Sequence, residues 1–89
     1  MKSSFEAVWD RIHALQGETF RQIRGGEFTY TVRSGYLAPD RTNRLIPRAD
    51  FEQAWEMAPL ESTVPVQRLQ GPSYIYAIIM DPRVRAGEW

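Results

Sequence analysis

The sequence predicts a small α+β domain in which an antiparallel sheet of three to four strands packs against two or three helices. Apolar residues recur about every 3.6 positions near the N-terminus and again after residue 50, which is typical of amphipathic helices. Between these segments, residues 27–32 alternate polar and apolar side chains, as a half-buried strand does. A chain of 89 residues supplies one core, so we expect residues 1–89 to form a single domain.

The first helix is predicted over residues 3–16. Its apolar stripe consists of Phe5, Val8, Trp9, Ile12 and Leu15. Ser3 and Glu6 match a capping box, in which each side chain accepts a hydrogen bond from the backbone N–H of the other residue. Gly17 suits the end of the helix, because it adopts a left-handed backbone without a Cβ clash. His13 lies beside the stripe and is predicted to be a boundary residue, not a catalytic one.

Residues 27–32 form the predicted central strand, with Phe28, Tyr30 and Val32 facing inward. The segment before it, residues 19–24, is a plausible partner strand. Gly25 and Gly26 separate the two segments, and both tolerate the positive φ that tight hairpin turns require. The sequence therefore predicts a hairpin here.

Further strands are predicted after a second turn at Ser34-Gly35. Tyr36-Leu37 begins a short strand, which we expect Pro39 to stop. Leu45-Ile46 is expected to return to the same sheet after a polar loop. These segments would complete an antiparallel meander.

A second helix is predicted over residues 47–58. Its apolar residues at helical spacing are Phe51, Ala54, Trp55 and Ala58. Pro47 suits the first position, where a missing N–H costs nothing. Asp50 and Glu52 fall near the positive end of the helix dipole, and Pro59 ends the helix.

Residues 74–80 are apolar throughout, and their periodicity does not separate a buried strand from a buried helix. Their β-branched and aromatic side chains suit a strand. Ser73 is a good N-cap, and Pro82 disfavours helical backbone at the residue before it. These flanking signals favour a short helix near 74–80.

The two remaining segments show weak patterns. Residues 60–70 read as a connector, because Pro65 argues against a central strand. A short edge strand remains open there, formed by Val64, Val66 and Leu69. Residues 83–89 have no period and are expected to be a partly mobile tail, although the terminal Trp89 is expected to dock.

The formal net charge is zero, with eleven basic and eleven acidic residues, which argues against binding nucleic acid through bulk charge. Residues 21–48 nevertheless hold six arginines against two acids, and residues 50–61 hold four acids and no base. Arginine presents a planar fork that suits phosphates, carboxylates and aromatic faces. The sequence thus predicts a basic sheet region beside an acidic helix.

The polar loop 40–44 is the most suggestive part of the basic region, because loops on a rigid scaffold often carry function. Its Arg41 and Arg44, together with Arg48, could converge on an anion. They could equally pair with acids of the following helix, or form a solvated face.

Several kinds of chemistry have no support in the sequence. It contains no cysteine and one histidine, which excludes disulfides and argues against transition-metal sites and most catalytic triads. We expect a non-catalytic protein without metal or cofactor. The longest apolar run is residues 74–80, and no signal peptide is recognised, so we expect a cytoplasmic protein with no membrane span.

Five short segments resemble a pattern in small bacterial proteins and appended modules that carry no assigned activity. These segments are Gly26–Tyr30 (GEFTY), Arg48–Ala54 (RADFEQA), Gly71–Tyr74 (GPSY), Ala77-Ile78 (AI) and Asp81–Arg83 (DPR). The resemblance covers residues 20 to 84. It implies a bacterial, cytoplasmic α+β module near DNA-processing proteins, and it supplies no catalytic residue.

Two functional hypotheses follow. The first is a protein-interaction module that binds another protein or a second copy of itself as a dimer, since eleven aromatic residues are many for so small a core. Trp, Tyr and Arg dominate interface hot spots. The candidate interaction aromatics are Tyr36, Tyr74, Tyr76 and Trp89.

The second hypothesis is a nucleic-acid-binding module. Tyr30 or Tyr36 would stack on an unpaired base, and arginines of the sheet and loop would contact phosphate. The candidate contacts are Arg21, Arg24, Arg33, Arg41, Arg44 and Arg48. The acidic helix and the single lysine argue against it.

Overall fold

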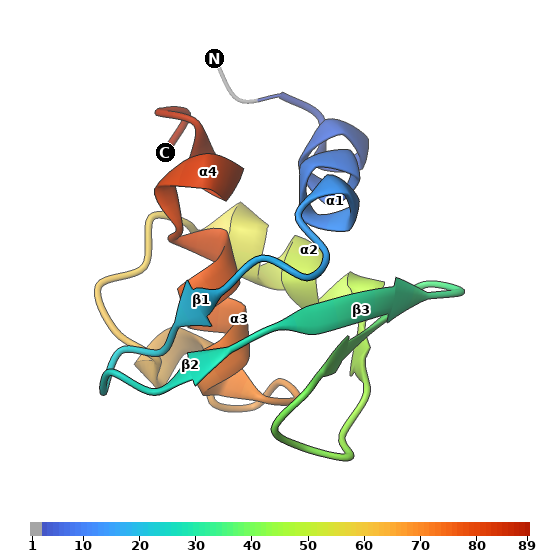
Figure 1. The fold of residues 1–89 in the computed structure, drawn as a ribbon. Coiled ribbons are helices and arrows are strands. Elements are labelled where there is room, and N and C mark those ends of the chain that lie inside the picture. The colour runs from blue at the N-terminus through green and yellow to red at the C-terminus, as the bar shows by residue number, and fades with distance from the viewer. Residues whose placement is uncertain (1–2) are drawn as a thin grey trace.

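In the computed structural model, which describes residues 3–89, the chain forms four α-helices, one 3-10 helix and five short strands (Figure 1). The helices are α1 (Phe5–Ala14), α2 (Arg48–Met57), η1 (Val64–Val66), α3 (Pro72–Ile79) and α4 (Pro82–Arg85). The strands are β1 (Phe20–Arg21), β2 (Glu27–Phe28), β3 (Tyr30–Arg33), β4 (Tyr36–Pro39) and β5 (Ile46–Pro47). All strand pairs are antiparallel, which confirms the predicted α+β class.

The strands form two sheets, not the single meander that was predicted. β1 pairs with β2, and a three-stranded sheet has the order β3-β4-β5. The predicted strand 27–32 changes partner at Thr29: Phe28 lies opposite Phe20, whereas Tyr30 lies opposite Pro39. The carboxylate of Asp40 accepts the Thr29 N–H at 3.0 Å in place of a backbone carbonyl. The β3–β4 ladder therefore ends at this point.

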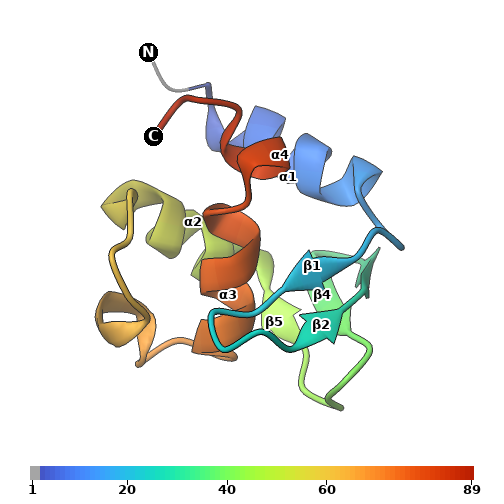
Figure 2. The ribbon, with the colours of Figure 1, turned by 60° about the vertical axis from the view of Figure 1, so that its left-hand side comes forward.

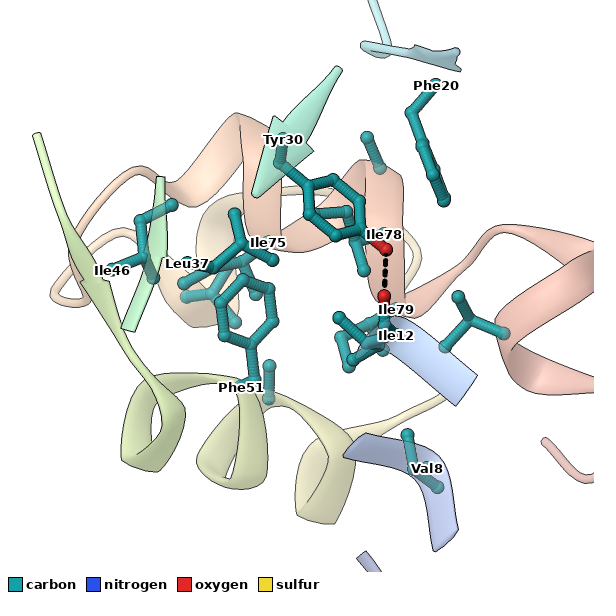
Figure 3. Close-up of a cluster of buried hydrophobic side chains, with 14 of the residues drawn as sticks. Val8, Ile12, Phe20, Tyr30, Leu37, Ile46, Phe51, Ile75, Ile78 and Ile79 are labelled. Atoms are coloured by element: carbon teal, nitrogen blue, oxygen red, sulfur yellow. Dashed lines mark hydrogen bonds between the residues drawn. The ribbon is translucent and has the colours of Figure 1, made fainter. Parts of the chain in front are cut away.

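Helix α3 runs through the middle of the molecule, between α2 and the β1–β2 hairpin (Figure 2). Ile75, Ile78 and Ile79 on this helix are fully buried. Figure 3 shows Ile75 beside Leu37 of β4 and Phe51 of α2, and Ile78 beside Tyr30 of β3. Such burial explains why residues 74–80 carry no polar face, and it confirms the predicted helix.

The predicted caps of two helices were wrong by one or two residues. Ser4, not Ser3, caps α1 by accepting the Ala7 N–H at 3.4 Å. At α3 the N-cap is Gly71, with Pro72 in the first turn. Ser73 instead accepts a hydrogen bond from the Gln22 amide, which lies across on the β1–β2 turn. Both serines are drawn into contacts between distant segments, which capping rules do not consider.

Three prolines lie at the ends of elements or in a turn, and β4 ends at Pro39 as predicted. Pro39 is the last residue of β4, because β5 does not extend far enough to need its missing N–H. Pro47 ends β5 and precedes α2. Pro65 lies inside η1, so residues 64–66 form a 3-10 turn and not an edge strand. The fixed φ of proline suits that turn.

The C-terminal segment, expected to be a partly mobile tail, folds back onto α1 (Figure 1). Val84 of α4 is fully buried. The Trp89 indole N–H donates to the Ile79 carbonyl at 2.9 Å, so this residue docks as expected. The Glu88 carboxylate accepts the Ser3 N–H at 2.7 Å and pairs with Arg11 at 3.1 Å. The two ends of the described chain are thus tied together.

None of the helices formed by residues 3–89 is long and apolar enough to cross a membrane.

Candidate interaction surface

The six arginines of residues 21–48 divide into separate groups. Arg21 and Arg41 lie at the β1–β2 hairpin, where both contact Glu27: Arg21 pairs with its carboxylate at 3.1 Å and Arg41 donates to its carbonyl oxygen at 3.3 Å. Arg24 lies in the turn of the same hairpin. Arg33 lies beside the β3–β4 turn, at the opposite side of the molecule (Figure 1). The arginines therefore do not converge on one face.

Local contacts occupy some of these side chains. Arg48 stacks over the Phe5 ring at 5.0 Å, and its guanidinium lies 4.0 Å from the Glu52 carboxylate. This ion pair matches the predicted alternative in which Arg48 pairs with an acid of the following helix. Arg24, Arg33 and Arg44 are exposed. Within residues 3–89 none of these three forms an ion pair. They are the cations that remain available to a partner.

Of the four candidate aromatics, Tyr36 alone is exposed, at 45%. Tyr74 is half-buried and packs edge-on against Phe28, with ring centroids 4.9 Å apart. Tyr76 and Trp89 are also half-buried against the core. Tyr36 is thus the aromatic that a partner can reach most fully.

Tyr36 lies at the centre of an uncovered sheet face. It is opposite Arg33 on β3 and opposite Pro47 on β5. Side chains alternate along a strand, so these residues share one face, while Leu37 and its neighbours point into the core. Leu45, which precedes the buried Ile46, is 53% exposed. We call this the outer sheet face: Thr31, Arg33, Tyr36, Ala38, Leu45 and Pro47.

Neither edge of this sheet offers a long row of unpaired backbone groups to a further strand. On the free edge of β3, the Gln16 side-chain oxygen accepts the Val32 N–H at 2.7 Å, and the Gly17 N–H donates to the Tyr30 carbonyl at 3.2 Å. The other edge strand, β5, has two residues and ends in proline. Exposed edges otherwise recruit extra strands. A partner would therefore contact the face of the sheet, not extend it.

Among residues 3–89, no three histidine, aspartate or glutamate side chains gather as metal ligands would. His13 is exposed, and its ring contacts the Gln16 amide at 3.2 Å.

Sequence reasoning missed a second exposed region. A hollow of about 330 Å³, which we call the hairpin hollow, lies between the β1–β2 turn, η1 and the start of α3. Ile23 in that turn is 54% exposed, and Val64 of η1 is 67% exposed. The one available signal was an isoleucine placed directly before the Arg24-Gly25-Gly26 turn. The hollow itself joins three distant segments, which no local pattern indicates.

Comparisons with protein-family models, with curated proteins and with solved structures gave no match. The resemblance to bacterial modules therefore stays a prediction.

Proposed function

We propose that this chain is a non-catalytic protein-interaction module, and that its outer sheet face binds an acidic surface of a different protein. The observation that supports this best is the exposure of Tyr36 and Leu45, at 45% and 53%, on the outer sheet face. Tyrosine supplies a large contact area with few rotamers to immobilise. Neither sheet edge offers a long row of unpaired backbone groups, so the face is the accessible part.

The charge around this face indicates the chemistry of the partner. Arg33 lies on the face, and Arg44 lies in the loop directly before Leu45; neither forms an ion pair within residues 3–89. A second copy docked face to face would bring these cations together, and like charges oppose such a contact. A partner that carries carboxylates around an apolar residue fits better.

The experiment that tests this proposal is affinity capture followed by a direct titration. Wild type and the double variant Tyr36→Ser/Leu45→Ser would be compared, with Val64→Ser as a matched control at another exposed apolar position. We expect a protein retained by wild type and by the control, but not by the double variant, and confirmed by titration with the purified protein. Equal retention by all three would reject the outer sheet face.

Nucleic acid is the second candidate ligand, because Arg33 lies opposite Tyr36 on the outer sheet face. The Tyr36 ring can stack on an unpaired base while the Arg33 guanidinium contacts the phosphate. The division of the arginines argues against it. Titration with single-stranded oligonucleotides at low salt decides. Binding that Arg33→Ala and Tyr36→Ala weaken would favour nucleic acid, and no binding at 50 mM salt would reject it.

A further inference from the structure

The hairpin hollow is a second surface feature, and it does not depend on the outer sheet face. Three segments far apart in the sequence form its walls: residues 22–24, residues 63–67 and the first turn of α3. Its volume of about 330 Å³ reaches the range of small-molecule pockets.

The polar lining carries one formal charge, the cation of Arg24, beside amides and hydroxyls that can donate hydrogen bonds. Arg24 contributes a guanidinium, Gln67 an amide, and Thr63 and Ser73 contribute hydroxyls. The Gln22 amide donates to the Ser73 oxygen at 2.9 Å, which leaves the Ser73 hydroxyl hydrogen available to a ligand. None of the lining residues is acidic. The chemistry therefore suits an acceptor with a negative charge.

Backbone hydrogen bonds hold two of the three walls, residues 22–24 and 63–67, in place without a ligand. The Gln22 N–H donates to the Gly26 carbonyl at 2.7 Å, and the Gly25 N–H donates to the Gln22 carbonyl at 2.8 Å. On the opposite wall, the buried Val66 donates its N–H to Thr63 at 3.0 Å. A site that needs little ordering loses less entropy on binding.

An apolar contact accompanies the donors. Ile23 lines the hollow and is 54% exposed. Isoleucine is not among the residues that dominate turns, and here its side chain gives the hollow an apolar surface. A ligand with an aliphatic part would cover it.

We propose that the hairpin hollow binds a carboxylate that is attached to a small aliphatic group. One guanidinium matches one negative charge, and its fork fits the two oxygens of a carboxylate. Two sources share this chemistry. One is a free or C-terminal carboxylate, and the other is an acidic side chain inside a peptide.

The proposal is tested by following backbone amide resonances of the whole chain during titration. N-acetyl-leucine carries the carboxylate and the aliphatic group, and N-acetyl-leucinamide lacks only the charge. A blocked peptide, acetyl-Leu-Glu-Leu-amide, places the carboxylate on a side chain. We expect saturable shifts at residues 22–24, 63–67 and 73, by about 10 mM ligand, with one or both carboxylates. The arm that binds identifies the source.

A matched pair of variants completes the experiment. Arg24→Gln keeps hydrogen-bond donors but removes the charge, and we expect it to weaken binding roughly tenfold. Arg33→Gln, at the other exposed end of the molecule, should leave it unchanged. No shift with either carboxylate, equal shifts with the neutral amide, or full binding by Arg24→Gln would each overturn the proposal.

Discussion

The Tyr30 hydroxyl on β3 donates a hydrogen bond to the carbonyl oxygen of Ile12 on α1, with 2.5 Å between the two oxygens (Figure 3). Both residues are buried. The bond joins the three-stranded sheet to the last turn of the first helix, where carbonyl groups lack helical partners. It is one of the contacts that hold the sheet against the helices while leaving the outer sheet face open.

Tyr30→Phe is expected to lower the free energy of unfolding by about 1 kcal/mol. The cost stays modest because the Leu15 N–H also donates to the Ile12 carbonyl, at 3.2 Å. Urea denaturation of wild type and variant checks this. An unchanged or higher stability would show that the bond contributes nothing net.

The same phenol predicts a loss of stability in alkaline solution. Burial raises the pKa of Tyr30 above its usual value, so the folded protein holds this proton more tightly than the unfolded chain does. The resulting stabilisation is complete below the unfolded pKa of about 10 and is lost as pH rises through the folded value. Thermal unfolding at several pH values should show a steeper alkaline loss for wild type than for Tyr30→Phe. Parallel curves would contradict the assignment.

Glu88 predicts the opposite dependence in acid. The Ser3 N–H, and then Arg11, lower the pKa of the Glu88 carboxyl to about 2. A lowered folded pKa stabilises the protein above the unfolded pKa of about 4.3, and this contribution disappears as pH falls toward 2. Glu88→Gln should therefore reduce the melting temperature at pH 7 and make it less sensitive to acid. If the melting temperatures of wild type and Glu88→Gln fell equally with pH, the contacts of Glu88 with Ser3 and Arg11 would be absent in solution.

The positions of the three longer helices could be predicted from the sequence, whereas the strand pairing and the capping residues could not. The periods of residues 5–15 and 51–58 placed α1 and α2 correctly, because those helices bury one face each. Ser73 and Pro82 indicated a helix near residues 74–80, and α3 forms there although Gly71, not Ser73, is its N-cap. The change of partner at Thr29 and the capture of Ser73 by Gln22 depend on contacts between segments distant in the chain. Tertiary contacts of that kind decide details that local propensity leaves open.

The same holds for the candidate sites. The sequence did not distinguish Tyr36 from the other candidate aromatics. The greater exposure of Tyr36 and the half-buried positions of Tyr74 and Tyr76 depend on how the sheet and α3 pack. The separation of Arg33 from the β1–β2 turn follows from its place at the far end of β3, beside the β3–β4 turn.

Gln16 is expected to protect the edge of β3. Its side-chain oxygen accepts the Val32 N–H at 2.7 Å, so Gln16→Ala should free that amide. Hydrogen exchange should then accelerate at Val32 while Leu37, inside the sheet, stays protected. The exposed edge should also promote association at high concentration, which light scattering detects. Unchanged exchange at Val32 would reject this role.

Gly71 allows a close approach between α3 and β5. Its φ is +59°, and a Cβ there would lie 2.9 Å from the Ile46 side chain. Gly71→Ala should therefore cost roughly 2 kcal/mol of stability or more, from strain and overpacking together. Gly17→Ala is the matched control, because Gly17 also has a positive φ but has nothing within 4 Å of its Cβ position. Equal losses in the two variants would show that the contact with Ile46 has no cost.

The most direct test of the outer sheet face is hydrogen exchange on the complex between this chain and a partner purified by the capture experiment. We expect new protection at residues 31–38 and 45–47, and a loss of binding in Tyr36→Ser/Leu45→Ser with the fold intact. Protection confined to other parts of the chain, or undiminished binding by the double variant, would contradict a docking role for this face.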